Sequence, residues 1–103
     1  EAMACGVPVI ATDWSAPTEF MRAGIGYPLR VRGLVPAVAR NPYYAGFSWA
    51  EPDFEHLVHL LRHIYEHRDE ARATGARAAA AVAREWAWAH AAAKIIARLD
   101  AIG

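Results

Sequence analysis

The sequence predicts an α/β protein, and three observations lead to that class. Residues 7–11 are a short apolar run rich in β-branched side chains, which is typical of a strand buried on both faces of a parallel sheet. This run lies between a helix end and a helix start, the order found in doubly wound sheets. Residues 53–103 show apolar residues at helical spacing. We therefore expect a short parallel sheet followed by a C-terminal helical tail.

The opening segment contains the signals that set this order. Residues 1–5 are interpreted as a helix end stopped by Gly6, because glycine adopts the left-handed conformation that closes a helix. Residues 13–16 have turn chemistry, and Pro17 suits the first position of a helix, where its missing N–H would be unbonded anyway. Ligands of doubly wound sheets gather beyond the carboxyl ends of the strands, so we expect a site at residues 12–18.

The next elements are a short helix and an edge strand. Residues 17–23 should form the helix, with Phe20 and Met21 packing inward. Apolar and polar residues alternate over residues 26–32, which indicates a half-exposed strand. Pro28 favours an edge position because it cannot donate a ladder hydrogen bond.

The tail should contain three helices. Asp53 is a plausible cap for the first, residues 69–85 form the second, and residues 88–101 form the third. We expect Trp86 and Trp88, at the joint before the third helix, to anchor the tail. The buried side of the third helix should consist of Ile95, Ile96, Leu99 and Ile102.

The composition argues against a nucleic-acid partner and against a membrane-spanning segment. The 103 residues suffice for one compact unit, and eleven basic side chains balance eleven acidic ones. The sequence therefore gives no electrostatic reason to expect a nucleic-acid partner. It contains no transmembrane segment and no signal-peptide pattern, and its single cysteine fits a reducing compartment. We expect a cytoplasmic protein, with peripheral attachment to the inner membrane face left open.

The opening residues also carry a family resemblance. The run EAMACGVPVIATD (1–13), followed by PTE (17–19), resembles the donor-binding half of a GT-B-fold glycosyltransferase of the retaining family 4, the "glycosyl transferases group 1" type. Weaker similarity continues to the C-terminus. The resemblance implies a partial Rossmann-like half of a GT-B fold. It also implies an enzyme that transfers a sugar from a nucleotide-sugar donor to an unknown acceptor with retention, with no cofactor and no obligatory metal.

The resemblance also implies how the chain is divided. Residues 1–32 form the α/β part, residues 33–52 an insert loop, and residues 53–103 the helical tail. Because the chain begins inside what we interpret as a helix, we expect a fragment that lacks the N-terminal acceptor domain. In the resembled fold the last helix crosses onto that domain, so part of its apolar surface should be exposed here. We expect this fragment to be inactive alone and to contain no catalytic residue.

The donor-site residues implied by the resemblance are few. The Glu1 carboxylate should accept hydrogen bonds from the ribose hydroxyls, a task that suits two acceptor oxygens. Residues of the donor-cleft loop follow the first strand: Thr12, Asp13, Ser15, Pro17, Thr18 and Glu19. Asp13 is interpreted chiefly as a loop-former that bonds backbone N–H groups, and Glu19 as a first-turn charge favoured by the helix dipole. Ser15 and Thr18 are the candidates for direct polar contact with the donor.

The insert at residues 33–52 is longer than the connection in most members of the family. Its lack of periodicity predicts a loop, and its aromatic content argues against disorder. Tyr43, Phe47 and Trp49 either pin it to the surface or form a lip beside the cleft, where a ring could stack on a sugar or base. The sequence leaves both alternatives open.

Four histidines form a stripe on the first tail helix: His56, His59, His63 and His67. A pair at this spacing can chelate zinc, but the surrounding charged residues favour a solvated polar face, so no metal site is predicted. Two further functions stay open beside the glycosyltransferase. One is a nucleotide-sugar epimerase of the same fold, and the other is a non-enzymatic helical interaction module.

Overall fold

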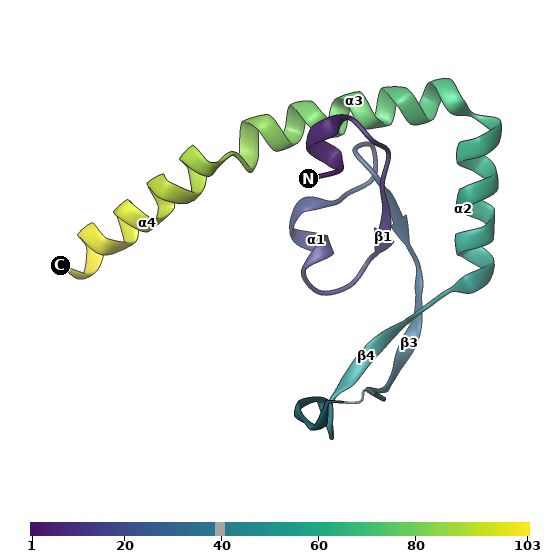
Figure 1. Cartoon of the computed structure of the whole chain (residues 1–103), viewed down its shortest axis with the longest axis horizontal. Coiled ribbons are helices and arrows are strands. Elements are labelled where there is room, and N and C mark those ends of the chain that lie inside the picture. Colours follow the sequence, from purple (N-terminus) through teal and green to yellow (C-terminus); the bar gives the residue numbers. More distant parts are fainter. Residues whose placement is uncertain (39–40) are drawn as a thin grey trace.

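The structure is a computed structural model that describes residues 1–38 and 41–103. In chain order its elements are η1 (Met3–Cys5), β1 (Ile10–Thr12), α1 (Pro17–Phe20), β2 (Tyr27–Leu29), β3 (Val31–Pro36), η2 (Pro42–Tyr44), β4 (Ser48–Pro52), α2 (Phe54–Glu66), α3 (Arg68–Glu85) and α4 (Trp88–Ile102). The chain is thus α/β, with a short sheet and a C-terminal helical tail, as predicted. Figure 1 shows α2 and α3 meeting at an angle, with β1 and α1 inside it.

The opening segment has the predicted order with a shorter strand. Gly6 closes the 3-10 helix η1 in the left-handed conformation, with φ 73°. β1 pairs in parallel with β2, so that Ile10 lies opposite Tyr27. The prediction of a strand at residues 7–11 that is buried on both faces is wrong in two respects, the length of the strand and its burial. Only its last two residues belong to β1, which is half-buried because a single neighbouring strand leaves its other edge uncovered.

α1 begins at Pro17, as predicted, but it ends at Phe20 instead of residue 23. The chain leaves the helix at Met21, whose backbone is extended and whose side chain is buried. The predicted strand at residues 26–32 is split into β2 and β3, with Arg30 between them. Burial still alternates along β2, since Tyr27 and Leu29 are buried on either side of a half-buried proline.

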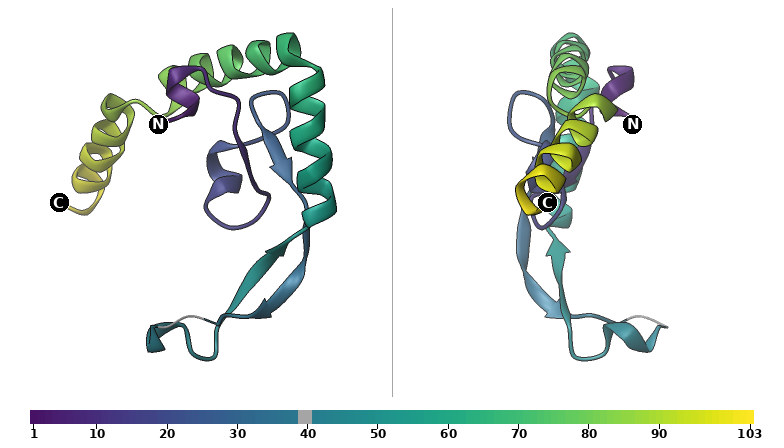
Figure 2. Two further views of the ribbon diagram at one scale, coloured as in Figure 1. Left: turned by 45° about the vertical axis from the view of Figure 1, so that its right-hand side comes forward. Right: turned by 90° about the vertical axis from the view of Figure 1, so that its left-hand side faces the viewer.

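The prediction of an irregular insert loop at residues 33–52 is wrong. Residues 31–36 and 48–52 form an antiparallel hairpin, β3–β4, in which Val35 lies opposite Trp49. Phe47 and Tyr43 are not pinned to the surface, because 66% and 83% of their areas are exposed. Both views of Figure 2 show the hairpin extending away from the helices and the parallel strands.

The Asp53 cap at the start of α2 is confirmed. The carboxylate accepts a hydrogen bond from the backbone N–H of His56 at 3.0 Å and another from Arg30 Nε at 2.8 Å. Both bonds favour the charged form and therefore lower the pKa of Asp53 below its usual value. The bond from His56 has the larger effect and the bond from Arg30 the smaller one. Leu60 on α2 then packs against the buried Tyr27 and Leu29 of β2.

η1 packs on α3 through a close contact between their backbones. Gly75, inside α3, lies so near Gly6 that a side chain at position 75 would overlap the Gly6 carbonyl. Ala71 and Ala78, on the same helix, are also buried. Their small side chains let another segment come close to the axis of α3. This contact places the start of the chain over the middle of α3 (Figure 1).

The side of α4 that we predicted to be buried is exposed, which agrees with the expectation that part of its apolar surface would be uncovered. Each of its four large aliphatic side chains is more than half exposed: Ile95, Ile96, Leu99 and Ile102. Trp88 is 91% exposed, so it is not an anchor, whereas Trp86 meets Phe20 edge-to-face at 6.2 Å. The radius of gyration, 17.1 Å, exceeds the value of about 13 Å typical of a compact domain of this length. The reason is that the β3–β4 hairpin, which we call the arm, and α4 lie outside the packed part (Figure 1).

Candidate functional site

Glu1 stands at a cavity of about 310 Å³. Its lining is mostly apolar and comes from four parts of the chain: Glu1, Ala2, Met3, Val9, Phe20, Val82 and Trp86. The contact of η1 with α3 brings the start of the chain to Val82, and the Phe20–Trp86 pair supplies two aromatic rings. An exposed carboxylate beside an apolar, ring-lined hollow suits a ligand that has hydroxyl groups next to a flat apolar group.

The charges beside Trp86 are mostly paired. The Glu85 carboxylate accepts hydrogen bonds from Arg84 at 2.8 Å and from Arg22 at 3.2 Å, and these bonds, the Arg84 bond first, lower the pKa of Glu85. Lys94 Nζ lies 5.9 Å from the centre of the Trp86 ring. A cation at this distance from an indole ring is attracted to its face. Lys94 is not among the residues that line the Glu1 cavity.

The predicted loop lies at the carboxyl end of the parallel pair. The backbone N–H of Asp13 donates to the carbonyl of Leu29 at 2.9 Å, which ties the start of the loop to the end of β2. Thr18 Oγ1 donates to the Ser15 carbonyl at 2.7 Å, and Ser15 itself has a positive φ of 58°. A left-handed serine costs of order 1–3 kcal/mol, so the surrounding bonds must hold it in place.

Two expectations about individual loop residues have different outcomes. Glu19 lies in the first turn of α1, as expected. Asp13 was expected to bond backbone N–H groups through its carboxylate. Within residues 1–38 and 41–103 the loop is closed by Thr18 and by backbone bonds instead, and no N–H donates to the Asp13 side chain.

The structure does not bring Glu1 and the loop residues into one cavity. Val9, which lines the Glu1 cavity, precedes β1, and Phe20 ends α1, so the cavity lies toward the amino end of β1. None of the predicted loop residues is among the residues that line it: Thr12, Asp13, Ser15, Pro17, Thr18 and Glu19. The hairpin aromatics do not line it either. Sequence reasoning missed Trp86 and Val82, since nothing in local spacing connects α3 with the first residues.

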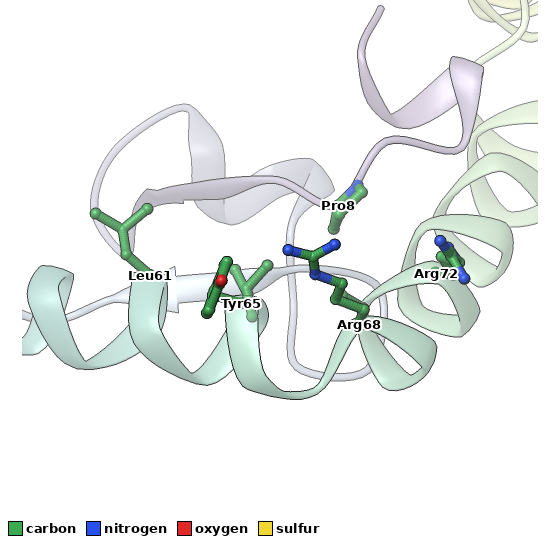
Figure 3. Close-up of a pocket in the computed structure, with 7 residues that line it drawn as sticks. Pro8, Leu61, Tyr65, Arg68 and Arg72 are labelled. Atoms are coloured by element: carbon green, nitrogen blue, oxygen red, sulfur yellow. The ribbon is translucent and has the colours of Figure 1, made fainter.

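A second cavity, of about 350 Å³, lies between the segment before β1 and the junction of α2 with α3. Its wall is formed by Pro8, Leu61, Ile64, Tyr65, Arg68, Ala71 and Arg72. The Arg68 guanidinium lies 4.8 Å from the centre of the Tyr65 ring, and Figure 3 shows it between this ring and Pro8. No residue that we predicted for the site contributes to this cavity.

The histidine stripe is present, but it is not a fully solvated face. His63 packs edge-on against Tyr27, with ring centres 6.3 Å apart, and its Nε2 is 3.1 Å from Glu70 Oε1. The backbone N–H of Arg30 donates to Nδ1 of His56 at 3.0 Å. These contacts position α2 against β2 and the start of β3. In the part of the chain that the structure describes, no group of three or more His, Cys, Asp or Glu residues is placed to hold a metal ion.

Comparisons of the chain with protein-family models, with curated proteins and with solved structures found no match in any of the three. None of the helices within residues 1–38 and 41–103 has both the length and the apolar composition needed to span a bilayer.

Proposed function

We propose that this chain is part of the nucleotide-sugar-binding half of a retaining, GT-B-type glycosyltransferase. The proposal rests on the opening motif and on the observation that the Glu1 carboxylate stands at a ring-lined cavity. In this assignment the two carboxylate oxygens accept hydrogen bonds from the vicinal hydroxyls of the ribose. The apolar walls formed by Phe20 and Trp86 then receive the flat base.

The local structure around the motif is compatible with this assignment. Gly6, the parallel β1 and the proline that opens α1 follow one another as in a Rossmann-like unit. Gly75 contributes by letting η1, and Glu1 with it, approach α3 closely. The loop from Thr12 to Glu19 lies at the carboxyl end of β1, outside the Glu1 cavity, so this assignment gives Ser15 and Thr18 no contact with a donor bound in that cavity.

The whole proposed enzyme needs more than these residues. A retaining transfer requires donor and acceptor to be enclosed between two domains, because the reacting centre must be positioned and kept from water. The acceptor domain would belong to another part of a longer protein, and the exposed aliphatic side of α4 would pack against it. We place the reaction in the cytoplasm, and we expect no cofactor, no obligatory metal and no sugar transfer by the 103 residues alone.

The exposed side of α4 also favours a second candidate, a non-enzymatic interaction module, because a large uncovered apolar surface marks a site of association. The two candidates differ in whether nucleotides bind. An epimerase of the same fold would bind the same donor, and the longer protein would then release an isomerised sugar without any acceptor.

Isothermal titration with UDP, GDP and ADP tests the proposal. We expect at least one of these nucleotides to bind, and we expect Glu1→Ala to weaken its binding by about tenfold or more, since a charge-assisted hydrogen bond contributes about 1.5–3 kcal/mol. Glu51→Ala removes another exposed carboxylate, on the hairpin, and should leave the affinity unchanged. Absence of binding by all three nucleotides would contradict the proposal, as would equal affinities of the wild-type chain and Glu1→Ala.

A further inference from the structure

The cavity between the segment before β1 and the junction of α2 with α3 combines apolar walls with positive charge. We call it the Arg68 cavity. Its volume of about 350 Å³ falls within the range of about 300–1,000 Å³ that is usual for pockets that hold small molecules. Its lining consists of apolar or aromatic residues and two arginines: Pro8, Leu61, Ile64, Tyr65 and Ala71, with Arg68 and Arg72. Among the residues that the structure describes, no acidic side chain lines it.

Arg68 is held by stacking and has no counter-ion. Its guanidinium lies 4.8 Å from the centre of the Tyr65 ring, between this ring and Pro8 (Figure 3). Stacking on a ring covers a face of the guanidinium and leaves its N–H donors, which lie in the plane of the group, open to a ligand. Within residues 1–38 and 41–103, no carboxylate forms an ion pair with Arg68. An arginine held in this way can donate two parallel hydrogen bonds to an oxyanion.

Arg72 and the start of α3 add to the positive charge at this place. Arg72 Nη1 donates to Asp69 Oδ1 at 3.3 Å, but the two side chains are 78% and 99% exposed, so water competes for this bond. No side chain caps α3 at His67, so the N–H groups of its first turn contribute a partial positive charge. Glu70 of the same turn lies 3.1 Å from His63 Nε2, and neither Asp69 nor Glu70 lines the cavity.

These properties restrict the ligand to one chemical class. A purely apolar molecule would cover the Arg68 guanidinium and leave its charge without a partner. A small inorganic anion would pair with that charge but leave the apolar walls in contact with water. A cation would be repelled. A molecule that has both an oxyanion and an apolar group satisfies both parts of the cavity.

We propose that the Arg68 cavity is a binding site for a small molecule in which a carboxylate or a phosphate is joined to an apolar group. The oxyanion accepts hydrogen bonds from the Arg68 guanidinium, and the apolar group lies against Leu61 and Ile64. This inference is independent of the nucleotide site, because the Arg68 cavity and the Glu1 cavity share no lining residue.

Isothermal titration with phenyl phosphate and with benzoate, each up to about 10 mM, tests the proposal. At least one of them should bind at a single site, and the comparison of the two shows which oxyanion is preferred. Inorganic phosphate, acetate and benzyl alcohol each carry one half of the proposed ligand. Each should bind about tenfold more weakly or not at all.

Arg68→Gln should weaken the binding of the preferred probe about tenfold or more, because it removes the charge and nearly keeps the length of the side chain. Arg62→Gln is the matched control. It removes the same charge from an exposed position of α2 that does not line the cavity, and it should leave the affinity unchanged.

A second measurement needs no substitution and therefore does not depend on the folding of a variant. In the wild-type chain, the preferred probe should shift the methyl resonances of Leu61 and Ile64, while the indole resonance of Trp86 stays constant. The proposal would be overturned if neither probe bound up to about 10 mM, or if Arg68→Gln bound as tightly as the wild-type chain. It would also be overturned if inorganic phosphate or acetate bound as tightly as the preferred probe, or if the shifts appeared at Trp86 and α4 instead of at Leu61 and Ile64.

Discussion

Gly75 in α3 is the position where helix propensity and packing oppose each other most directly. A glycine inside a helix costs about 1 kcal/mol relative to alanine, so Gly75→Ala would stabilise the chain if propensity decided the outcome. In the folded chain, however, a Cβ at this position would overlap the carbonyl oxygen of Gly6 and lie 2.8 Å from its carbon. The nitrogen of Pro8 would be 3.2 Å away. All three are backbone atoms, which cannot rotate out of the way.

We therefore expect Gly75→Ala to destabilise the chain by about 1–3 kcal/mol, the usual cost of overpacking, in spite of the gain in propensity. For a chain of about 100 residues this lowers the melting temperature by roughly 4–8 °C per kcal/mol, which circular dichroism measures. Because Glu1 lies just before η1, the same substitution should also weaken the proposed binding of nucleotides.

The control is Ala76→Gly, at an exposed position of the same helix, which should cost about 1 kcal/mol through propensity alone. If Gly75→Ala raises the melting temperature, propensity outweighs packing at this position. The close approach of η1 to α3 would then be wrong, together with the cavity that it forms.

Three further outcomes follow from the packing and the charges. Leu60→Ala should cost about 2–3 kcal/mol in urea unfolding, whereas Leu61→Ala, more than half exposed, should cost less than about 1 kcal/mol. The lowered pKa of Asp53 means that its contribution is present at neutral pH and is lost as the pH falls through that pKa. Asp53→Asn should therefore be less stable at neutral pH and lose less stability on acidification, in melts across a pH series. Trp88→Ala should leave the melting temperature within about 2 °C, because the ring is 91% exposed.

The parts of the fold that local chemistry determines could be predicted from the sequence. Gly6 ends η1, Pro17 begins α1 and Asp53 caps α2, because each residue type has one conformation or hydrogen bond that it favours strongly. The helix boundaries around Glu85 were likewise readable from apolar spacing.

The hairpin could not be predicted in the same way. Its strands carry apolar residues on both faces, so they lack the alternation that indicates a half-buried strand. Pro36 and Gly46 are punctuating residues, and together with that missing alternation they suggested an irregular loop. The pairing of Val35 with Trp49 joins residues on either side of the turn, and no local pattern shows it.

Two other features also depend on contacts between residues far apart in the sequence. These are the burial of the helical tail and the walls of the Glu1 cavity. The spacing of Ile95 and Leu99 correctly indicates a helix with an apolar side, but burial requires another surface, and the described chain provides none. Trp86 reaches the Glu1 cavity only because η1 packs on α3. The motif at the start of the chain therefore points to Glu1 and the loop after β1, while the walls beside Glu1 become visible only in the folded chain.

The most direct measurement of the proposed nucleotide site is a ¹⁵N–¹H chemical-shift titration of the chain with UDP, GDP and ADP. The proposed function predicts that one nucleotide shifts the backbone resonances of Met3 and Val9 and the indole resonance of Trp86, and that Glu1→Ala moves the midpoint of this titration to about tenfold higher nucleotide concentration or more. Trp88 and the arm should not respond. Unchanged spectra with all three nucleotides, or shifts confined to α4 and the arm, would contradict the assignment of the Glu1 cavity as a nucleotide site.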